Sequence, residues 1–71
     1  MYRVQDTEPA KAKLYKTARI KNRLGSLVEG TFVAVRYRWT DVHGNNIYFV
    51  VDAMGREERE VMEGDLKDFC L

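Results

Sequence analysis

The sequence of 71 residues lacks several features on which large classes of proteins depend. A single cysteine, Cys70, excludes an intramolecular disulfide, and no CxxC pair or Cys/His cluster indicates a metal site. The first residues lack the apolar run of a signal peptide, and no stretch approaches the roughly 20 apolar residues of a membrane span. We therefore expect a cytoplasmic protein with no membrane partner, no metal and no small-molecule cofactor.

Catalytic constellations are missing as well. No Ser/His/Asp set, Gly-rich phosphate loop or carboxylate pair at catalytic spacing occurs in the sequence. The one histidine, His43, lies in a turn segment between Asp41 and Asn45, where a general base would have neither a pocket nor a positioned partner. A chain this short buries only about 60% of its unfolded surface, so one protomer has little room for a catalytic cleft. The sequence predicts a binding module and not an enzyme.

Charge is divided unevenly along the chain. Residues 1–40 hold nine Lys and Arg against three Asp and Glu, whereas residues 41–71 hold three against eight, although the net charge is only +1. Such a division is typical of proteins that meet a polyanion or an oppositely charged protein. We expect either a protein partner, which includes a second copy of the chain, or nucleic acid.

The clearest signal of secondary structure lies in residues 31–40. Apolar and aromatic side chains alternate there with small or basic ones, which predicts a strand with one buried face. The inward set is Val33, Val35, Tyr37 and Trp39, and the outward set is Ala34, Arg36 and Arg38.

A second strand is predicted at residues 47–52. The segment 41–46 contains Asp, Gly and Asn, the residues of tight turns, so it joins the two strands as a β-hairpin. By alternation Ile47, Phe49 and Val51 share the inward face, and Tyr48 and Val50 lie outward.

The remaining elements are less regular. Residues 57–62 predict a polar third strand, followed by a helical turn over residues 65–69 and a terminal stub of strand at residues 70–71. Before residue 30 two alternatives stay open. One is a strand over residues 16–22; the other is a helix over residues 8–24, with Thr7 as N-cap and Gly25 as stop. Residues 1–13 are expected to form a tail or weak edge strand, and residues 14–71 a single domain.

In this order of elements the chain resembles the small SH3-like β-barrel, which has five short antiparallel strands and one helical turn before the last. The resemblance rests on the run GTFVAV at residues 30–35, which enters the second strand, and on VMEGDL at residues 61–66. It implies a mainly β protein; the alternative is an α+β fold with an N-terminal helix on a three-stranded antiparallel sheet. Barrels of this type bind peptides, nucleic acids or copies of themselves, so the resemblance does not select a function.

The candidate binding residues lie mainly on the predicted outward face. Arginines beside an exposed ring suit nucleic acid, because cations meet phosphates and rings stack on bases. Alternatively, the Arg stems cover Tyr48 and are neutralised by Glu58 and Glu60 on the next strand. Trp39, at the open end of the predicted barrel, either anchors a partner or caps the core. The candidates are Arg19, Lys21, Arg36, Arg38, Trp39 and Tyr48.

The leading hypothesis is a non-enzymatic interaction module that binds a protein partner or itself, with Trp39 and Tyr48 as apolar anchors. An outward patch of Tyr48 and Val50, extended by the loop at residues 24–28, would favour self-association. The alternative is a nucleic-acid-binding module that uses the arginines, Lys21 and Tyr48.

Overall fold

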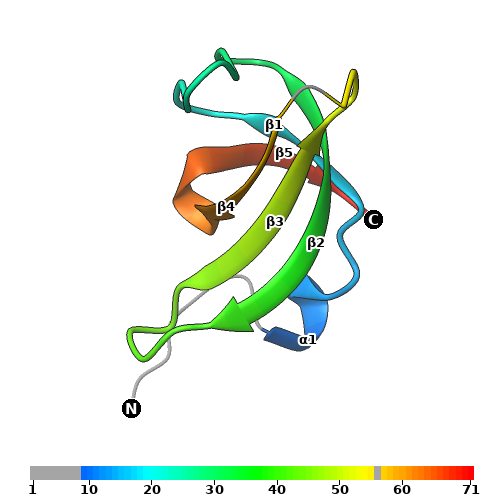
Figure 1. Cartoon of the computed structure of the whole chain (residues 1–71). Helices are drawn as coiled ribbons and strands as arrows, with labels where there is room; N and C mark the ends of the chain where they lie inside the picture. Colours follow the sequence, from blue (N-terminus) through cyan, green and yellow to red (C-terminus); the bar gives the residue numbers. More distant parts are fainter. Residues whose placement is uncertain (1–8, 56) are drawn as a thin grey trace.

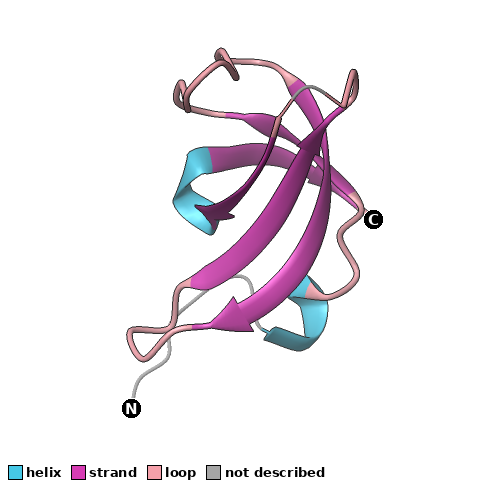
Figure 2. Cartoon of the chain, viewed as in Figure 1, coloured by secondary structure: helices cyan, strands magenta, loops and turns pink. Residues whose placement is uncertain are grey.

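The computed structural model describes residues 9–55 and 57–71, which form five antiparallel strands and two helical turns (Figure 1 and Figure 2). The strands are β1 (Thr17–Ile20), β2 (Phe32–Thr40), β3 (Asn46–Asp52), β4 (Glu58–Met62) and β5 (Leu66–Cys70). The helical turns are α1 (Pro9–Ala12) and the 3-10 turn η1 (Glu63–Asp65). The protein is therefore mainly β, which confirms the predicted fold class.

The strands form one sheet in the order β4-β3-β2-β1-β5. Because β4 and β5 are its two edges, the sheet is not closed into a complete barrel. It nevertheless curls: β5 crosses behind β3 in Figure 1, and the ring centroids of Phe69 on β5 and Tyr48 on β3 lie 5.3 Å apart. The core fills the inside of this curl, and the other side of the sheet is called the outer face below.

Small and medium apolar side chains from every strand make up the core. Val33 near the start of β2 and Val50 of β3 are fully buried, and Ala12 from α1 joins them. Burial of each side chain the size of valine or leucine contributes about 1.5–3 kcal/mol. The other buried members of the cluster are Ala18, Ile20, Leu27, Val35, Tyr48, Val61 and Leu66.

The faces predicted for β3 are wrong. Val35 lies directly opposite Val50, and Tyr37 lies opposite Tyr48; residues directly opposite share a face of the sheet. Tyr48 and Val50 are therefore buried, whereas Phe49 lies on the outer face and stays partly exposed. All five side chains in the middle of this strand are apolar or aromatic, so alternation alone did not identify the inward set.

The predicted inward position of Trp39 is wrong as well. The pairing shifts by one residue between Tyr37, opposite Tyr48, and Trp39, opposite Ile47. Such a bulge sets two residues of one strand against one of its partner, so Trp39 turns to the outer face opposite Ile47, which is itself buried as predicted. Its side chain is 51% exposed and lies outside the core.

The ends of the chain also differ from prediction. The helical alternative for residues 8–24 is wrong beyond its first turn, because α1 ends at Ala12 and β1 follows, which also excludes the α+β fold. The helical turn predicted at residues 65–69 lies earlier, in η1, and β5 replaces the terminal stub. The tail or edge strand predicted at residues 1–13 lies mostly outside the described residues, and its described part is α1. Within those residues, neither helical turn is long and apolar enough to cross a membrane.

Candidate functional site

Among the described residues, the long strand β2 has a neighbouring strand along only half of one edge. β1 pairs with residues 32–34 of β2, and the last bond between the two segments runs from the Val35 N–H to the Lys16 carbonyl at 2.9 Å. The same register would bring Leu14 opposite Tyr37, but the Leu14 N–H donates instead to the Lys11 carbonyl in a helical turn at 3.0 Å. No described strand continues beside residues 36–40, which we call the free half of β2.

The free half presents backbone polar groups to this open edge. In an antiparallel ladder, successive residues turn their N–H and C=O groups to opposite neighbours. Because Val35 faces β1, Tyr37 faces the same edge beyond the end of β1. After the bulge, the Asp41 N–H donates to the Asn45 carbonyl across the hairpin at 3.0 Å, so the preceding Thr40 also faces the open edge. Five residues of strand, roughly 17 Å of backbone, are available for pairing.

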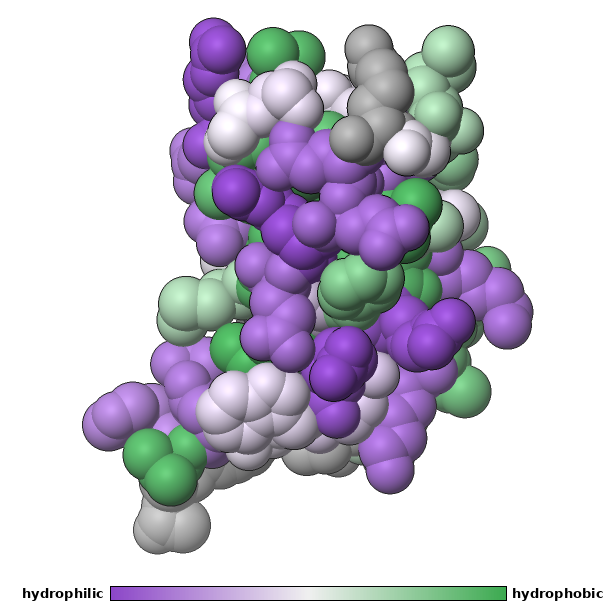
Figure 3. Space-filling view, in the orientation of Figure 1, coloured by the Kyte–Doolittle hydropathy of each residue, from purple (hydrophilic) through white to green (hydrophobic). Residues whose placement is uncertain are grey.

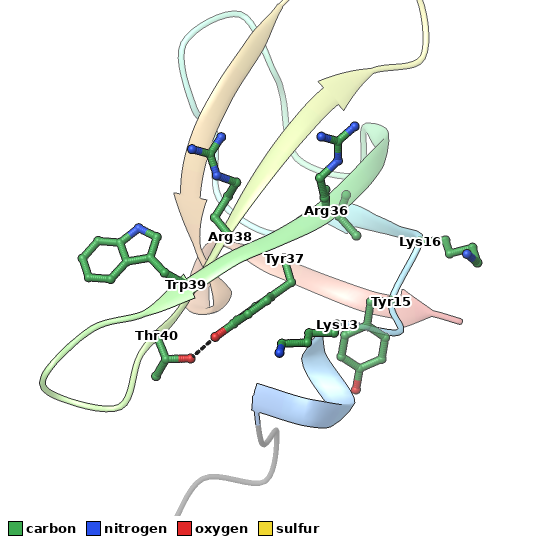
Figure 4. A pocket seen from close by; sticks show the side chains of 9 residues that line it. Lys13, Tyr15, Lys16, Arg36, Tyr37, Arg38, Trp39 and Thr40 are labelled. Carbon is green, nitrogen blue, oxygen red and sulfur yellow. Dashed lines mark hydrogen bonds between the residues drawn. The ribbon is translucent and has the colours of Figure 1, made fainter.

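An open groove with a volume of about 790 Å³ follows this edge (Figure 4). Figure 4 shows Arg36 and Arg38 on one side of β2 and Tyr37 on the other side, toward Lys13 and Tyr15. The open backbone edge of β2 thus lies between two walls. One wall is formed by side chains of β2, and the other by Lys13, Tyr15 and Lys16 in the segment that links α1 to β1. The lining residues are Lys13, Tyr15, Lys16, Val35, Arg36, Tyr37, Arg38, Trp39 and Thr40, which we call the β2 groove.

The β2 groove is basic and aromatic. Four of its lining residues are Lys or Arg and three carry aromatic rings, whereas none of the described residues that line it is acidic. The Lys13 ammonium lies 5.9 Å from the centroid of the Tyr37 ring, a cation–π distance. A concave surface lined by one sign of charge attracts ligands of the other sign, so the groove favours an anionic occupant.

Two contacts fix the groove's inner wall before any ligand arrives. The Tyr37 hydroxyl shares a 2.6 Å hydrogen bond with Thr40 Oγ1, which in turn lies 2.7 Å from Asn46 Oδ1. Tyr15 packs on Phe69, with ring centroids 4.6 Å apart. Groups held in this way lose little further conformational freedom when a ligand binds.

The arginines of β2 lie on the outer face as predicted, but they differ in their partners. The Arg38 guanidinium lies 5.9 Å from the Phe49 ring and 3.9 Å from the Glu60 carboxylate, so the neutralised face expected around Tyr48 forms around Phe49 instead. Both charged groups of this pair are about half exposed, and such pairs contribute little. Arg36 makes no ion pair with any described residue.

The other two basic candidates lie outside the groove. Arg19 stands opposite Phe32 on the outer face, with its guanidinium 5.3 Å from that ring, and donates from Nη1 to the Gly30 carbonyl at 2.9 Å. Lys21 follows the end of β1 and is exposed. Arg19 therefore extends the basic outer face, and neither residue touches the free edge.

Tyr48 is a core residue and not a surface anchor. It is fully buried, and its ring meets Tyr37 edge-on at 6.3 Å and Phe69 at 5.3 Å. Its hydroxyl has no hydrogen-bond partner among the described residues. Burial, with a smaller contribution from the nearby Glu63 carboxylate, raises the pKa of Tyr48 far above its ordinary value. Tyr48 supports the groove from beneath Tyr37.

The apolar patch predicted for self-association does not form. Tyr48, Val50 and Leu27 are all buried, and of the apolar loop residues Leu24 is partly buried and Val28 is half exposed. Figure 3 shows the visible surface over β2, β3 and β4 as mostly hydrophilic, with apolar side chains in separate places. This face lacks the continuous apolar area that marks a stable dimer interface.

Six of the nine groove residues were not among the predicted binding residues. Lys13 was assigned to a tail, Tyr15 precedes the strand predicted at residues 16–22, and Lys16 begins it. Val35 and Tyr37 were assigned to the core, and Thr40 to the end of the strand predicted at residues 31–40 without a binding role. The available signal was the difference between the predicted strands, ten residues at 31–40 against seven at 16–22, because unequal neighbours leave an unpaired edge.

The one histidine of the chain, His43, lies at the hairpin tip, and metal-binding geometry is absent from the described part of the chain. No group of three or more His, Cys, Asp and Glu there is placed to hold a metal ion. At the hairpin tip, Asp41 Oδ1 accepts the backbone N–H groups of His43 and Asn45, both at 2.9 Å. These bonds, that of Asn45 above all, lower the pKa of Asp41, so this carboxylate organises the turn.

The chain was compared with models of protein families, with curated proteins and with solved structures, and none of the three comparisons finds a match. No functional residue is therefore transferred from another protein. The β2 groove is the candidate site on its own geometry: a free backbone edge between basic and aromatic walls.

Proposed function

We propose that this protein is a non-enzymatic interaction module that binds an extended segment of a partner protein as an added strand on the free half of β2. The observation that carries the proposal is the open edge at Tyr37, whose N–H and C=O point into a groove where β1 has ended. In strand addition, main-chain hydrogen bonds supply affinity and side-chain contacts supply specificity.

We further propose that the fold is a small SH3-like barrel. Three features support this assignment: the order β4-β3-β2-β1-β5, the 3-10 turn between the last two strands, and the contact of Phe69 with Tyr48 that curls the sheet. The fold alone leaves the ligand open, and the groove is the feature that bears on it.

The walls of the groove favour a single chain over the edge of a folded sheet. Lys13, Tyr15 and Lys16 stand across from β2, so a folded partner that brought further strands would meet this wall. Pairing of two β2 edges would bring like charges together at Arg36 and Arg38, which is unfavourable. A lone extended segment avoids both costs.

Amide exchange of the protein with a bound peptide tests the proposal. Peptides selected from a random library are added to the isotopically labelled chain, and exchange is followed by NMR. We expect exchange at the Tyr37 and Thr40 amides to slow at least tenfold, because these donors gain partners, while the Val33 amide, already paired with β1, serves as the internal control. Selected peptides that bind without slowing exchange at Tyr37 would contradict strand addition.

Nucleic acid is the second candidate, favoured by the four cations and three rings of the groove. A single strand of nucleic acid would be held by side chains and would not pair with the backbone edge. The same exchange measurement therefore separates the two candidates.

A further inference from the structure

Basic and aromatic side chains alternate along the free half of β2, and this pattern indicates which side chains a bound segment should carry. We infer that the bound segment is an acidic peptide in which carboxylates flank a central apolar or aromatic residue. This inference rests on the strand addition proposed above and adds the sequence pattern that the groove selects.

Strand geometry sets the alternation. A residue of the added strand that pairs with Tyr37 lies on the same face as Tyr37, and its two neighbours lie on the opposite face. That opposite face carries Arg36 and Arg38, which flank Tyr37 in sequence and both lie on the outer face. The partner pattern that matches is therefore acid, apolar, acid.

The positive charges of Arg36 and Arg38 are available to a ligand. Among the described residues Arg36 makes no ion pair, and Arg38 makes one, the half-exposed contact with Glu60 at 3.9 Å. Adjacent strands lie about 4.8 Å apart, so carboxylates on the added strand would reach both guanidinium groups. Pairs of opposite charge across neighbouring strands stabilise a sheet by roughly 0.2–1 kcal/mol each.

The inner side of the groove suits an apolar centre. Tyr37 is half-buried and is supported beneath by Tyr48, and Tyr15 rests on Phe69. A ring or branched side chain opposite Tyr37 would pack on these faces. Lys13 lies over the Tyr37 ring and adds positive charge to the same wall.

Other occupants fit less well. The edge strand β4 carries Glu58 and Glu60 at alternate positions, so a second copy has the matching charge pattern. That strand is part of a folded sheet, however, and the wall at Lys13 and Lys16 opposes its entry. An oligonucleotide would use the cations but leave the Tyr37 backbone unpaired.

Binding of designed peptides tests the inference. A fluorescein-labelled peptide with Glu-Phe-Glu at its centre is compared by anisotropy with the neutral Gln-Phe-Gln peptide, with a version N-methylated at Phe, and with a single-stranded oligonucleotide. We expect the acidic peptide to bind at least tenfold more tightly than the neutral one, and N-methylation to weaken it at least tenfold. Arg36→Gln should weaken it about two- to fivefold, and Arg19→Gln, the matched control on the same face, less than twofold.

Each alternative outcome has a distinct meaning. Equal binding of both peptides, with slowed exchange at Tyr37, would overturn the acidic pattern and leave strand addition intact. Binding of the acidic peptide without slowed exchange, or without sensitivity to N-methylation, would overturn strand addition itself. Binding of the oligonucleotide alone would assign the groove to nucleic acid and overturn both proposals. Absence of binding by every probe would overturn the acidic pattern.

Discussion

The two halves of β2 belong to one strand, but they have different neighbours, and the second half contains the bulge. Residues 32–35, the paired half, lie between β1 and β3, and Val33 and Val35 are buried there. Among the described strands, β3 alone pairs with residues 36–40, which carry arginines and aromatic rings. A single strand therefore contributes buried residues at one end and an open edge at the other, and the length of its neighbour β1 decides where the division falls.

The boundary between the halves is set by how the chain enters β1. The N–H groups of Leu14 and Tyr15 donate back to Lys11 and Ala12 at 3.0 and 3.3 Å, so this segment turns instead of extending along β2. Ala12 is buried in the core and anchors the turn. The same turn places Lys13 and Tyr15 across from the open edge, so the interruption of pairing also builds the wall of the groove.

The largest difference between the halves is expected in stability. Val33→Ala removes two methyl groups from a fully buried site and should lower the free energy of unfolding by about 2 kcal/mol. Arg36→Ala, on the same strand but exposed, should change it by less than about 0.5 kcal/mol. Urea unfolding monitored by Trp39 fluorescence measures both. Similar losses in the two variants would remove the division of roles.

A second comparison uses two tyrosines that pair across β2 and β3. Tyr37→Phe removes the hydrogen bond to Thr40 and should lower the free energy of unfolding by about 1 kcal/mol. Tyr48→Phe removes a buried hydroxyl that has no described partner and should raise it by about 1 kcal/mol. Thermal unfolding of the two variants gives the signs. A loss of stability in Tyr48→Phe would show that a water or another group satisfies its hydroxyl.

The smallest effect on stability is expected at the contact between Glu57 and Ser26. The Glu57 carboxylate accepts the Ser26 hydroxyl and the Ser26 N–H, the latter at 3.1 Å, and these bonds lower the pKa of Glu57 from its ordinary value of 4.5. Folding therefore gains stability from this group above pH 4.5, and the gain is lost as the pH falls through the lowered folded-state pKa. Glu57→Gln should flatten the acid side of the stability profile slightly and leave peptide binding unchanged.

If the free energy of unfolding of Glu57→Gln depended on acid pH as it does in the unaltered protein, the prediction for Glu57 would be wrong. Because Asp41 also has a lowered pKa, Asp41→Asn provides the matched control in the other hairpin. The stability of Asp41→Asn should also depend less on pH in the acid range. The hydrogen bonds affected in this variant are those of the β2–β3 turn.

Much of the fold followed from local pattern. The strand signal at residues 31–40 was correct because Val33 and Val35 alternate with small or basic residues and one face is buried. β3 gave no such information, since apolar residues occupy both of its faces, and its orientation depends on pairing with β2. The bulge that turns Trp39 outward is one extra residue, and it has no distinct signature in the sequence.

The candidate site was predicted in part. Arg36 and Arg38 were placed correctly on the outer face because they follow the alternation of β2. Tyr48 was misplaced with the rest of its strand. The opposite wall of the groove depends on where β1 begins and how the chain turns after α1. The sequence of residues 8–24 fitted both a strand and a helix, so it did not predict this wall.

The pairing of β1 with β5 has a consequence for the order of events during synthesis. The Lys16 N–H donates to the Cys70 carbonyl at 2.8 Å, and Tyr15 packs on Phe69, so the inner wall of the groove is held by the last strand. The hairpins of β2, β3 and β4 join neighbours in sequence and form early, whereas contacts between distant residues form late. We therefore expect the inner wall of the groove to form only after β5 has been synthesised, and a chain cut before β5 to lack the contacts of Lys16 and Tyr15 that hold this wall.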